Sequence, residues 1–203
     1  MKLFAKLPKP AFDFLDAAGP DWRPILLVTL KTGLRQGELI GLQWADLDLQ
    51  RGKLQVRRAV WRGVTSLPKG GREWTVDLPG SAVEAFRAHR HLRGPYVFCQ
   101  EDGQPLTAGL MEVPLQRAVR SAGVSREQGR VGWHDIRHAY ASHLAMHGVP
   151  LKAIQELMGN ATIEMMERYA HLSPETRASV VHQLDLPAPQ TQAAPGRDAE
   201  GAH

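Results

Sequence analysis

Apolar residues recur at helical spacing along most of this 203-residue chain, and one stretch of strand-like alternation interrupts them. The alternation occupies residues 54–56 and 74–78, and the glycines and proline between these segments predict turns that join two or three strands. The segments expected to be helical are 12–15, 22–34, 37–42, 81–92, 108–122, 134–147, 151–157, 163–169 and 173–184. This order predicts an α+β fold, mostly helical, with a small antiparallel β-hairpin or sheet inserted in a single domain.

The C-terminal residues differ in composition from the rest of the chain. From Asp185 onward there are three prolines and no aromatic residue, which predicts a disordered tail over 185–203 after one domain spanning 1–184. The tail holds one arginine and three acids. The formal charge of +4 for the whole chain therefore becomes about +6 over residues 1–184.

Composition excludes several classes of protein. Cys99 is the only cysteine, so the sequence predicts neither a disulfide framework nor a cysteine-based zinc site. Apolar runs such as 24–30 are far shorter than the ~20 residues that cross a bilayer, and we expect a cytoplasmic protein with no membrane partner. Arginine supplies 18 of the 25 basic residues, which favours phosphate recognition because its planar fork grips oxyanions through two hydrogen bonds.

A basic segment lies over residues 51–72, within the predicted strands and turns. It holds seven arginines and lysines and no acid, a pattern that suits contact with a nucleic-acid backbone. An ordinary solvated hairpin with one charged face is the alternative. The candidate DNA-binding residues in this segment are Arg57, Arg58, Arg62 and Arg72.

Two further motifs carry charged side chains at helical spacing. In HDIRH, His134, Arg137 and His138 share one helix face, which predicts a phosphate-binding face, an ordinary surface helix or, least favoured, a zinc site. The zinc interpretation is disfavoured because a metalloprotease motif has glutamate directly after the first histidine, where this chain has aspartate. In TGLRQGEL, Arg35 lies between two glycines, and Glu38 is spaced to orient its guanidinium.

TGLRQGEL, KGGREWTVDLP, HDIRH and ERYAHL resemble, in this order, the motifs of the tyrosine recombinase (phage integrase) family over about residues 20–184. The resemblance implies a DNA-cleaving catalytic domain whose site residues are Arg35, Lys69, His134, Arg137, Asn160 and Tyr169, supported by Glu38 and His138. Spacing selects Tyr169 among the three tyrosines. Tyr96 is expected in an apolar strand and Tyr140 on the buried face of a helix.

The resemblance also implies a role for each residue. Arg35 and Arg137 would hold the non-bridging phosphate oxygens. Tyr169 would attack phosphorus, and His134 would take its proton. Lys69 would protonate the departing 5′ oxygen, so that a 3′-phosphotyrosyl bond stores the energy for rejoining and neither metal nor other cofactor is required.

Asn160 departs from the family pattern. Where an LGH-type motif usually places histidine or tryptophan, this chain reads Met158-Gly159-Asn160. An amide donates a neutral hydrogen bond but carries no charge. Loss of a charge-assisted bond costs roughly 1.5–3 kcal/mol, or about 10–150-fold in rate, so we expect weakened rather than abolished strand transfer.

Size is the second departure, because 34 residues precede Arg35 and the DNA-gripping domain common in the family is expected to be absent. Double-stranded DNA is the expected partner, with the protein on the nucleoid when bound. The 173–184 helix is expected to dock within its own domain or to link a homotetramer. The alternatives to a recombinase are a DNA-binding regulator or mobile-element relic with feeble catalysis, a type IB topoisomerase and, most distantly, a metallohydrolase.

Overall fold

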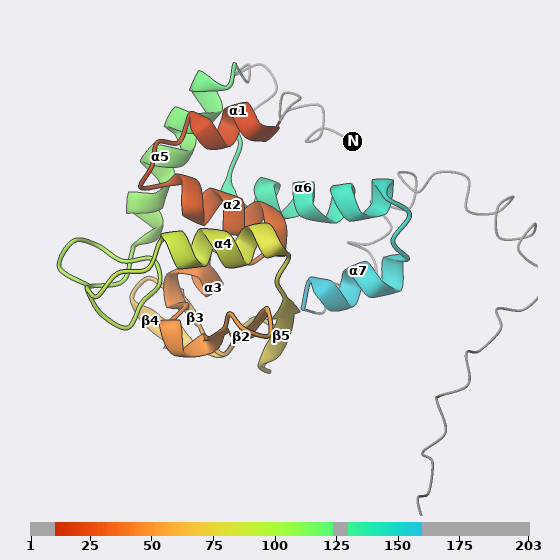
Figure 1. Cartoon of the computed structure of the whole chain (residues 1–203), viewed down its shortest axis with the longest axis horizontal. Coiled ribbons are helices and arrows are strands. Elements are labelled where there is room, and N and C mark those ends of the chain that lie inside the picture. The colour runs from red at the N-terminus through yellow and green to blue at the C-terminus, as the bar shows by residue number, and fades with distance from the viewer. Residues whose placement is uncertain (1–10, 124–129, 160–203) are drawn as a thin grey trace, which may run out of the picture. The chain divides into compact units, whose positions relative to one another are not determined.

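The computed structural model describes residues 11–123 and 130–159, and all of them belong to one unit within residues 1–173 (Figure 1). The helices are α1 (Ala11–Asp16), α2 (Arg23–Thr32), α3 (Gln36–Gly41), α4 (Gly80–Ala88), α5 (Ala108–Ser121), α6 (Trp133–Met146) and α7 (Leu151–Leu157), with a short 3₁₀ turn over Trp44–Asp46. The strands are β1 (Leu47–Asp48), β2 (Lys53–Val56), β3 (Ala59–Trp61), β4 (Val64–Ser66) and β5 (Trp74–Asp77). The predicted α+β architecture is confirmed.

The strands form two small antiparallel sheets. One has the order β1-β2-β5, with Leu54 opposite Val76, and the other is the β3-β4 hairpin, with Trp61 opposite Val64. Alternation explains the first sheet, because Leu54, Val56 and Val76 point into the core while Lys53 and Asp77 remain exposed. The prediction of two or three strands therefore undercounts the five that the described residues form.

The helices surround a continuous apolar core. α2 packs against α4 and α6, α1 against α5, and α3 against β3 (Figure 1). Ile25, Val28, Leu39, Phe86 and Ile136 are among the fully buried side chains that join these elements. Since α2, α3 and α6 meet here, the TGLRQGEL and HDIRH motifs are brought together.

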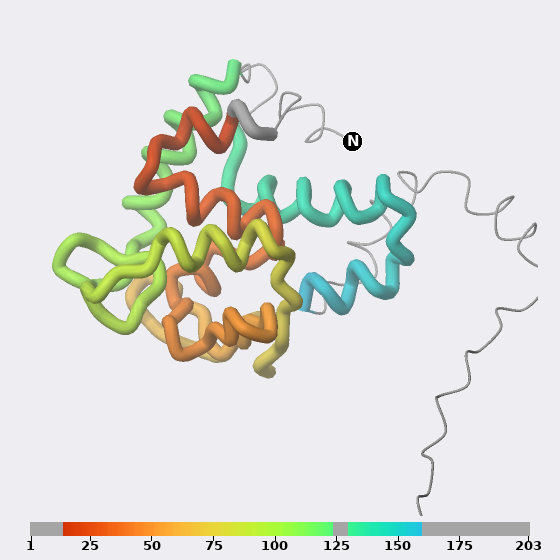
Figure 2. Tube along the Cα trace, in the orientation of Figure 1, coloured from red at the N-terminus to blue at the C-terminus, as the bar shows by residue number. Residues whose placement is uncertain are grey.

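Helix α7 turns back along α6 and ends beside β5 (Figure 2). Ile154 and Met158 are fully buried in a satellite cluster with Ala141 and Ala145 of α6. This packing carries the Met158-Gly159 turn to the edge of the three-stranded sheet. No helix in the described part of the chain is long and apolar enough to span a membrane.

Two sequence predictions need correction. The helix expected over 81–92 ends at Ala88, where the side chains of His89 and His91 turn toward the carbonyl oxygen of Val97 at 3.0 and 2.9 Å. The strand expected around Tyr96 is only an isolated bridge to Gln43. The expected helices at 163–169 and 173–184 and the 185–203 tail lie outside the described residues.

Candidate active site

Arg35 lies at the N-terminus of α3 and is anchored by a buried carboxylate. Its backbone N–H donates to Glu38 Oε2 and its Nη1 donates to Glu38 Oε1, each at 2.8 Å. Glu38 is only 2% exposed, whereas Arg35 is partly accessible. The expected orientation of Arg35 by Glu38 is therefore present, and 22% of the Arg35 side chain remains exposed.

Arg137 projects from α6 and is almost fully buried, with 1% of its surface exposed. Its Nη1 donates to the carbonyl oxygen of Gly33, and its Nη2 donates to that of Met158. Carbonyl oxygens hold a guanidinium in place without cancelling its charge. Arg137 is thus positioned from two sides, by the turn before α3 and by the turn after α7.

Gly33 is the position at which α2, α6 and the Arg35 turn meet. Its φ of +64° is in the left-handed region, and a Cβ there would lie 2.4 Å from Cδ1 of Tyr140. Only glycine accommodates both the positive φ and the lack of space for a Cβ beside Tyr140. Burial raises the pKa of Tyr140, so its hydroxyl stays protonated and is unsuited to be a nucleophile.

His134 lies in the first turn of α6, one helical turn from His138. The two rings meet edge to face with centroids 4.3 Å apart. Partial burial lowers the pKa of His134, and the positive charge of Arg137 lowers it further. Asp135 opposes this shift, whereas Arg35 and Lys69 act in the same direction as Arg137, so all three cations lie near enough to influence one imidazole.

A neutral imidazole at physiological pH is suited to accept a proton. A zinc site on the same residues lacks support here. Among residues 11–123 and 130–159, no group of three or more histidine, cysteine, aspartate or glutamate side chains could hold a metal ion.

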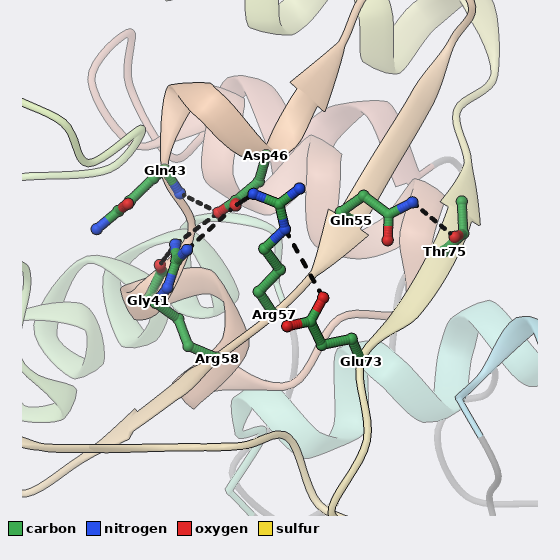
Figure 3. Close-up of polar contacts among 8 residues, drawn as sticks. All are labelled: Gly41, Gln43, Asp46, Gln55, Arg57, Arg58, Glu73 and Thr75. Atoms are coloured by element: carbon green, nitrogen blue, oxygen red, sulfur yellow. Dashed lines mark hydrogen bonds and ion pairs between the residues drawn. The ribbon is translucent and has the colours of Figure 1, made fainter.

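The basic segment is less free than its sequence suggests, because acids outside it approach several of its cations. Arg58 donates to both carboxylate oxygens of Asp46, at 2.7 and 3.2 Å, and Arg57 lies 3.6 Å from Asp46 and 3.7 Å from Glu73 (Figure 3). Arg51 and Lys53 pair with Asp48 and Asp77 in the same way. Arg58 therefore holds the loop after α3, and its assignment to DNA binding stays a prediction.

Three cations of the segment have no carboxylate partner within the described ranges. These are Arg62, Lys69 and Arg72, all exposed around the β3-β4 hairpin and the turn that leads to β5. Trp61 beside them is 62% exposed, and the Arg62 guanidinium lies 5.9 Å from its ring centroid. The exposed end of the hairpin is thus both cationic and apolar.

Asn160 and Tyr169 lie outside the described residues. Sequence reasoning missed two residues that hold the site in place, Asp46 and Trp74. Asp46 accepts from Gln43 N–H at 2.9 Å as well as from Arg58, and Trp74 lies against Gly159. The bond to Gln43 is local, at a spacing of three residues, but the contacts of Asp46 with Arg58 and of Trp74 with Gly159 join separate elements and have no local sequence signal.

Comparison with known proteins identifies the family. Residues 13–176 match the phage integrase family. A tyrosine recombinase XerC-like protein of Caldanaerobacter subterraneus is 29% identical over 80% of this chain and 49% of its own length. Tyrosine recombinase XerC of Xylella fastidiosa is 32% identical over 74% of this chain and 48% of its own length. The chain therefore spans about half the length of these curated relatives.

Solved structures share the fold. The Tn1549 transposon integrase in complex with a circular intermediate DNA superposes with a TM-score of 0.72 at 24% identity, over 89% of this chain and 65% of that one. The catalytic domain of bacteriophage HP1 integrase gives 0.62 at 24% identity, over 84% of this chain and 89% of that one. With the match over residues 13–176, this protein belongs to the phage integrase family of tyrosine recombinases.

Proposed function

We propose that this chain cleaves and rejoins DNA at specific sites through a covalent bond between Tyr169 and a 3′ phosphate. The observation that supports this most is the arrangement of His134 beside the anchored guanidinium groups of Arg35 and Arg137. Two fixed cations at one imidazole suit an anionic phosphodiester, whose extra transition-state charge they would stabilise.

Each bond change has a residue to carry it. The Tyr169 oxygen attacks phosphorus as His134 accepts the phenolic proton, and the P–O5′ bond breaks as Lys69 donates a proton to the 5′ oxygen. Rejoining is the same step in reverse with a 5′ hydroxyl of another strand. Phosphorus keeps its oxidation state and the number of phosphoester bonds is unchanged, so the reaction needs no external energy source.

The exposed end of the β3-β4 hairpin is the proposed DNA contact nearest to Lys69. Arg62 and Arg72 would contact backbone phosphates, and Trp61 supplies an exposed apolar surface beside Arg62. Arg57 is half-exposed and would join them only after leaving Asp46 and Glu73. Substitution of any one phosphate-binding arginine by alanine should reduce the slope of log K against log salt by about 0.9.

A library experiment tests the function without knowledge of the target sequence. Nicked duplexes with a randomised segment are incubated with the protein, and covalent adducts are recovered by denaturing electrophoresis and sequenced. We expect a recurring sequence at the adduct, and no adduct with Tyr169→Phe. DNA binding with no adduct from any duplex would refute the proposal in favour of a regulator. Relaxation of plasmids irrespective of sequence would favour a topoisomerase.

Asn160 is proposed to limit the rate of cleavage. The amide gives a transition-state oxygen a neutral hydrogen bond where a histidinium would give a charge-assisted one. Asn160→His should raise the cleavage rate about 10–150-fold at unchanged DNA affinity. An unchanged rate on a nicked substrate would contradict this account of the position.

Assembly on DNA is proposed to use residues 173–184, whose apolar positions Val180, Val181 and Leu184 recur at helical spacing. Exchange of this segment between subunits would link a homotetramer on the nucleoid. Truncation after Leu172 should then leave monomer folding intact and abolish DNA-dependent assembly in analytical ultracentrifugation. Unchanged assembly would exclude the exchange.

A further inference from the structure

The turn that follows α7 lies directly against the indole ring of Trp74. Gly159 has a φ of +58°, and a Cβ at this position would lie 2.5, 2.7 and 2.8 Å from Cε2, Cδ2 and Cζ2 of that ring. Approaches this short leave no room for any side chain. The backbone of Gly159 is therefore seated on the indole, and the ring limits where the turn can lie.

The same turn supplies one of the two acceptors that hold Arg137. The Met158 carbonyl accepts from Arg137 Nη2, while the backbone N–H of Gly159 donates to the Glu156 carbonyl at 2.9 Å. Met158 is fully buried against α6. Because Met158 and Gly159 are consecutive, a shift of Gly159 on the indole moves the acceptor of Arg137.

Trp74 is itself fixed by the sheet. It is the first residue of β5, pairs with Val56 of β2, and packs partly buried against the main core, with its Nε1 atom inaccessible to solvent. The indole thus transmits the position of the three-stranded sheet to the Met158-Gly159 turn. Lys69 is on the segment that leads into this strand.

We infer that Trp74 is a positioning residue for the proposed reaction: its indole fixes the Met158-Gly159 turn, and the turn orients the guanidinium of Arg137. This inference rests on the proposed function for the part that Arg137 plays. A displacement of a catalytic group by about 1 Å costs on the order of 100-fold in rate. The contact also links β5, the strand that follows Lys69, to Arg137, so the positions of Lys69 and Arg137 both depend on this strand.

The experiment compares Trp74→Phe, Trp74→Ala, Gly159→Ala and the double variant Gly159→Ala/Trp74→Ala. Trp44→Ala is the matched control, because Trp44 is also partly buried with an inaccessible Nε1, and its ring lies against His91 and Arg90. Circular dichroism checks folding. Single-turnover cleavage and DNA affinity are measured separately, and the Arg137 Nε–H signal is followed by NMR in DNA-free protein after assignment with Arg137→Lys.

We expect Trp74→Ala to slow cleavage on the order of 100-fold with DNA affinity changed less than about threefold. Its Arg137 signal should shift or broaden. Trp74→Phe should restore both because a flat ring remains, and Trp44→Ala should lose stability only. The double variant should be no slower than the slower single variant, since effects through one contact do not multiply whereas independent ones do.

An unchanged Arg137 signal in Trp74→Ala, or multiplied losses in the double variant, would overturn the inference. Failure of the proposed function gives a different result. In that case the wild type forms no covalent adduct with any duplex, while the NMR comparison still decides whether Trp74 positions Arg137.

Discussion

Removal of the Glu38 carboxylate should lower both the free energy of unfolding and the rate of DNA cleavage. Glu38→Ala deletes the acceptor of the Arg35 backbone N–H and of Arg35 Nη1, both at 2.8 Å, in a position where the carboxylate side chain is fully buried. The cap bond contributes about 1 kcal/mol, and breaking a fully buried ion pair costs about 3–5 kcal/mol. Arg35 keeps 22% of its side chain exposed and can rehydrate, so we expect a loss of about 2–4 kcal/mol.

Urea unfolding and thermal melting measure this loss, which corresponds to a Tm decrease of about 4–16 °C. Cleavage of a nicked duplex should fall on the order of 100-fold below the melting transition, because the freed guanidinium leaves its productive geometry. Thr107→Ala is the matched control, since Thr107 caps α5 through the Leu110 N–H at 3.2 Å and has no arginine partner. Thr107→Ala should lower the free energy of unfolding by about 0.5–2 kcal/mol and leave the cleavage rate unchanged. Equal cleavage in both variants would refute the reasoning.

Three further predictions concern the surroundings of the site. Gly33→Ala should destabilise the fold by about 2–5 kcal/mol in urea unfolding, because it combines positive φ with a contact of 2.4 Å to Tyr140; a loss below about 1 kcal/mol would contradict the geometry. Asp46→Ala should cost about 2–4 kcal/mol, since it removes a buried carboxylate from Arg58, which keeps 22% of its side chain exposed, and a value near zero would show that the pair is dispensable. The cleavage rate should fall with acidification at a pH below 6.5, because the pKa of His134 is lowered. Lys69→Ala should move this pH upward, because it removes a cation that lowers the pKa of His134. The pH dependence is measured on a nicked substrate with an activated 5′ leaving group, and a downward shift in Lys69→Ala would exclude His134 as the base.

The helical spacing of apolar residues predicted the positions of several helices well. The structure has α7 at Leu151–Leu157, as the spacing indicates, and α3 differs from its expected range by one residue at each end. The predictions that failed concern segments whose structure depends on contacts with other parts of the chain. The helix ends early at Ala88 because two histidine side chains bond to Val97, and an apolar run around Tyr96 forms only one bridge because no strand lies beside it within the described region.

The contacts at the site are likewise of two kinds, those that local spacing predicts and those that only tertiary packing produces. The contact between Arg35 and Glu38 follows from helical spacing, since three residues separate the two side chains. The approach of Arg35 to His134 followed only from the family resemblance, because periodicity does not say which helices pack together. The contacts of Arg58 with Asp46 and of Trp74 with Gly159 join different elements, and no local pattern indicates them.

One turn positions both guanidinium groups, and this constrains which substitutions the site tolerates. The Gly33 carbonyl accepts from Arg137, and two residues later the chain begins α3 with Arg35. Arg137 donates from Nη1 and Nη2 to two carbonyl oxygens and Arg35 donates from Nη1 to Glu38, and a lysine with a single ammonium centre does not reproduce the planar fork that makes these contacts. Because the anchors are present without DNA, both guanidinium groups are positioned during folding rather than on binding. An arginine-to-lysine exchange at either position should therefore impair cleavage far more than DNA affinity.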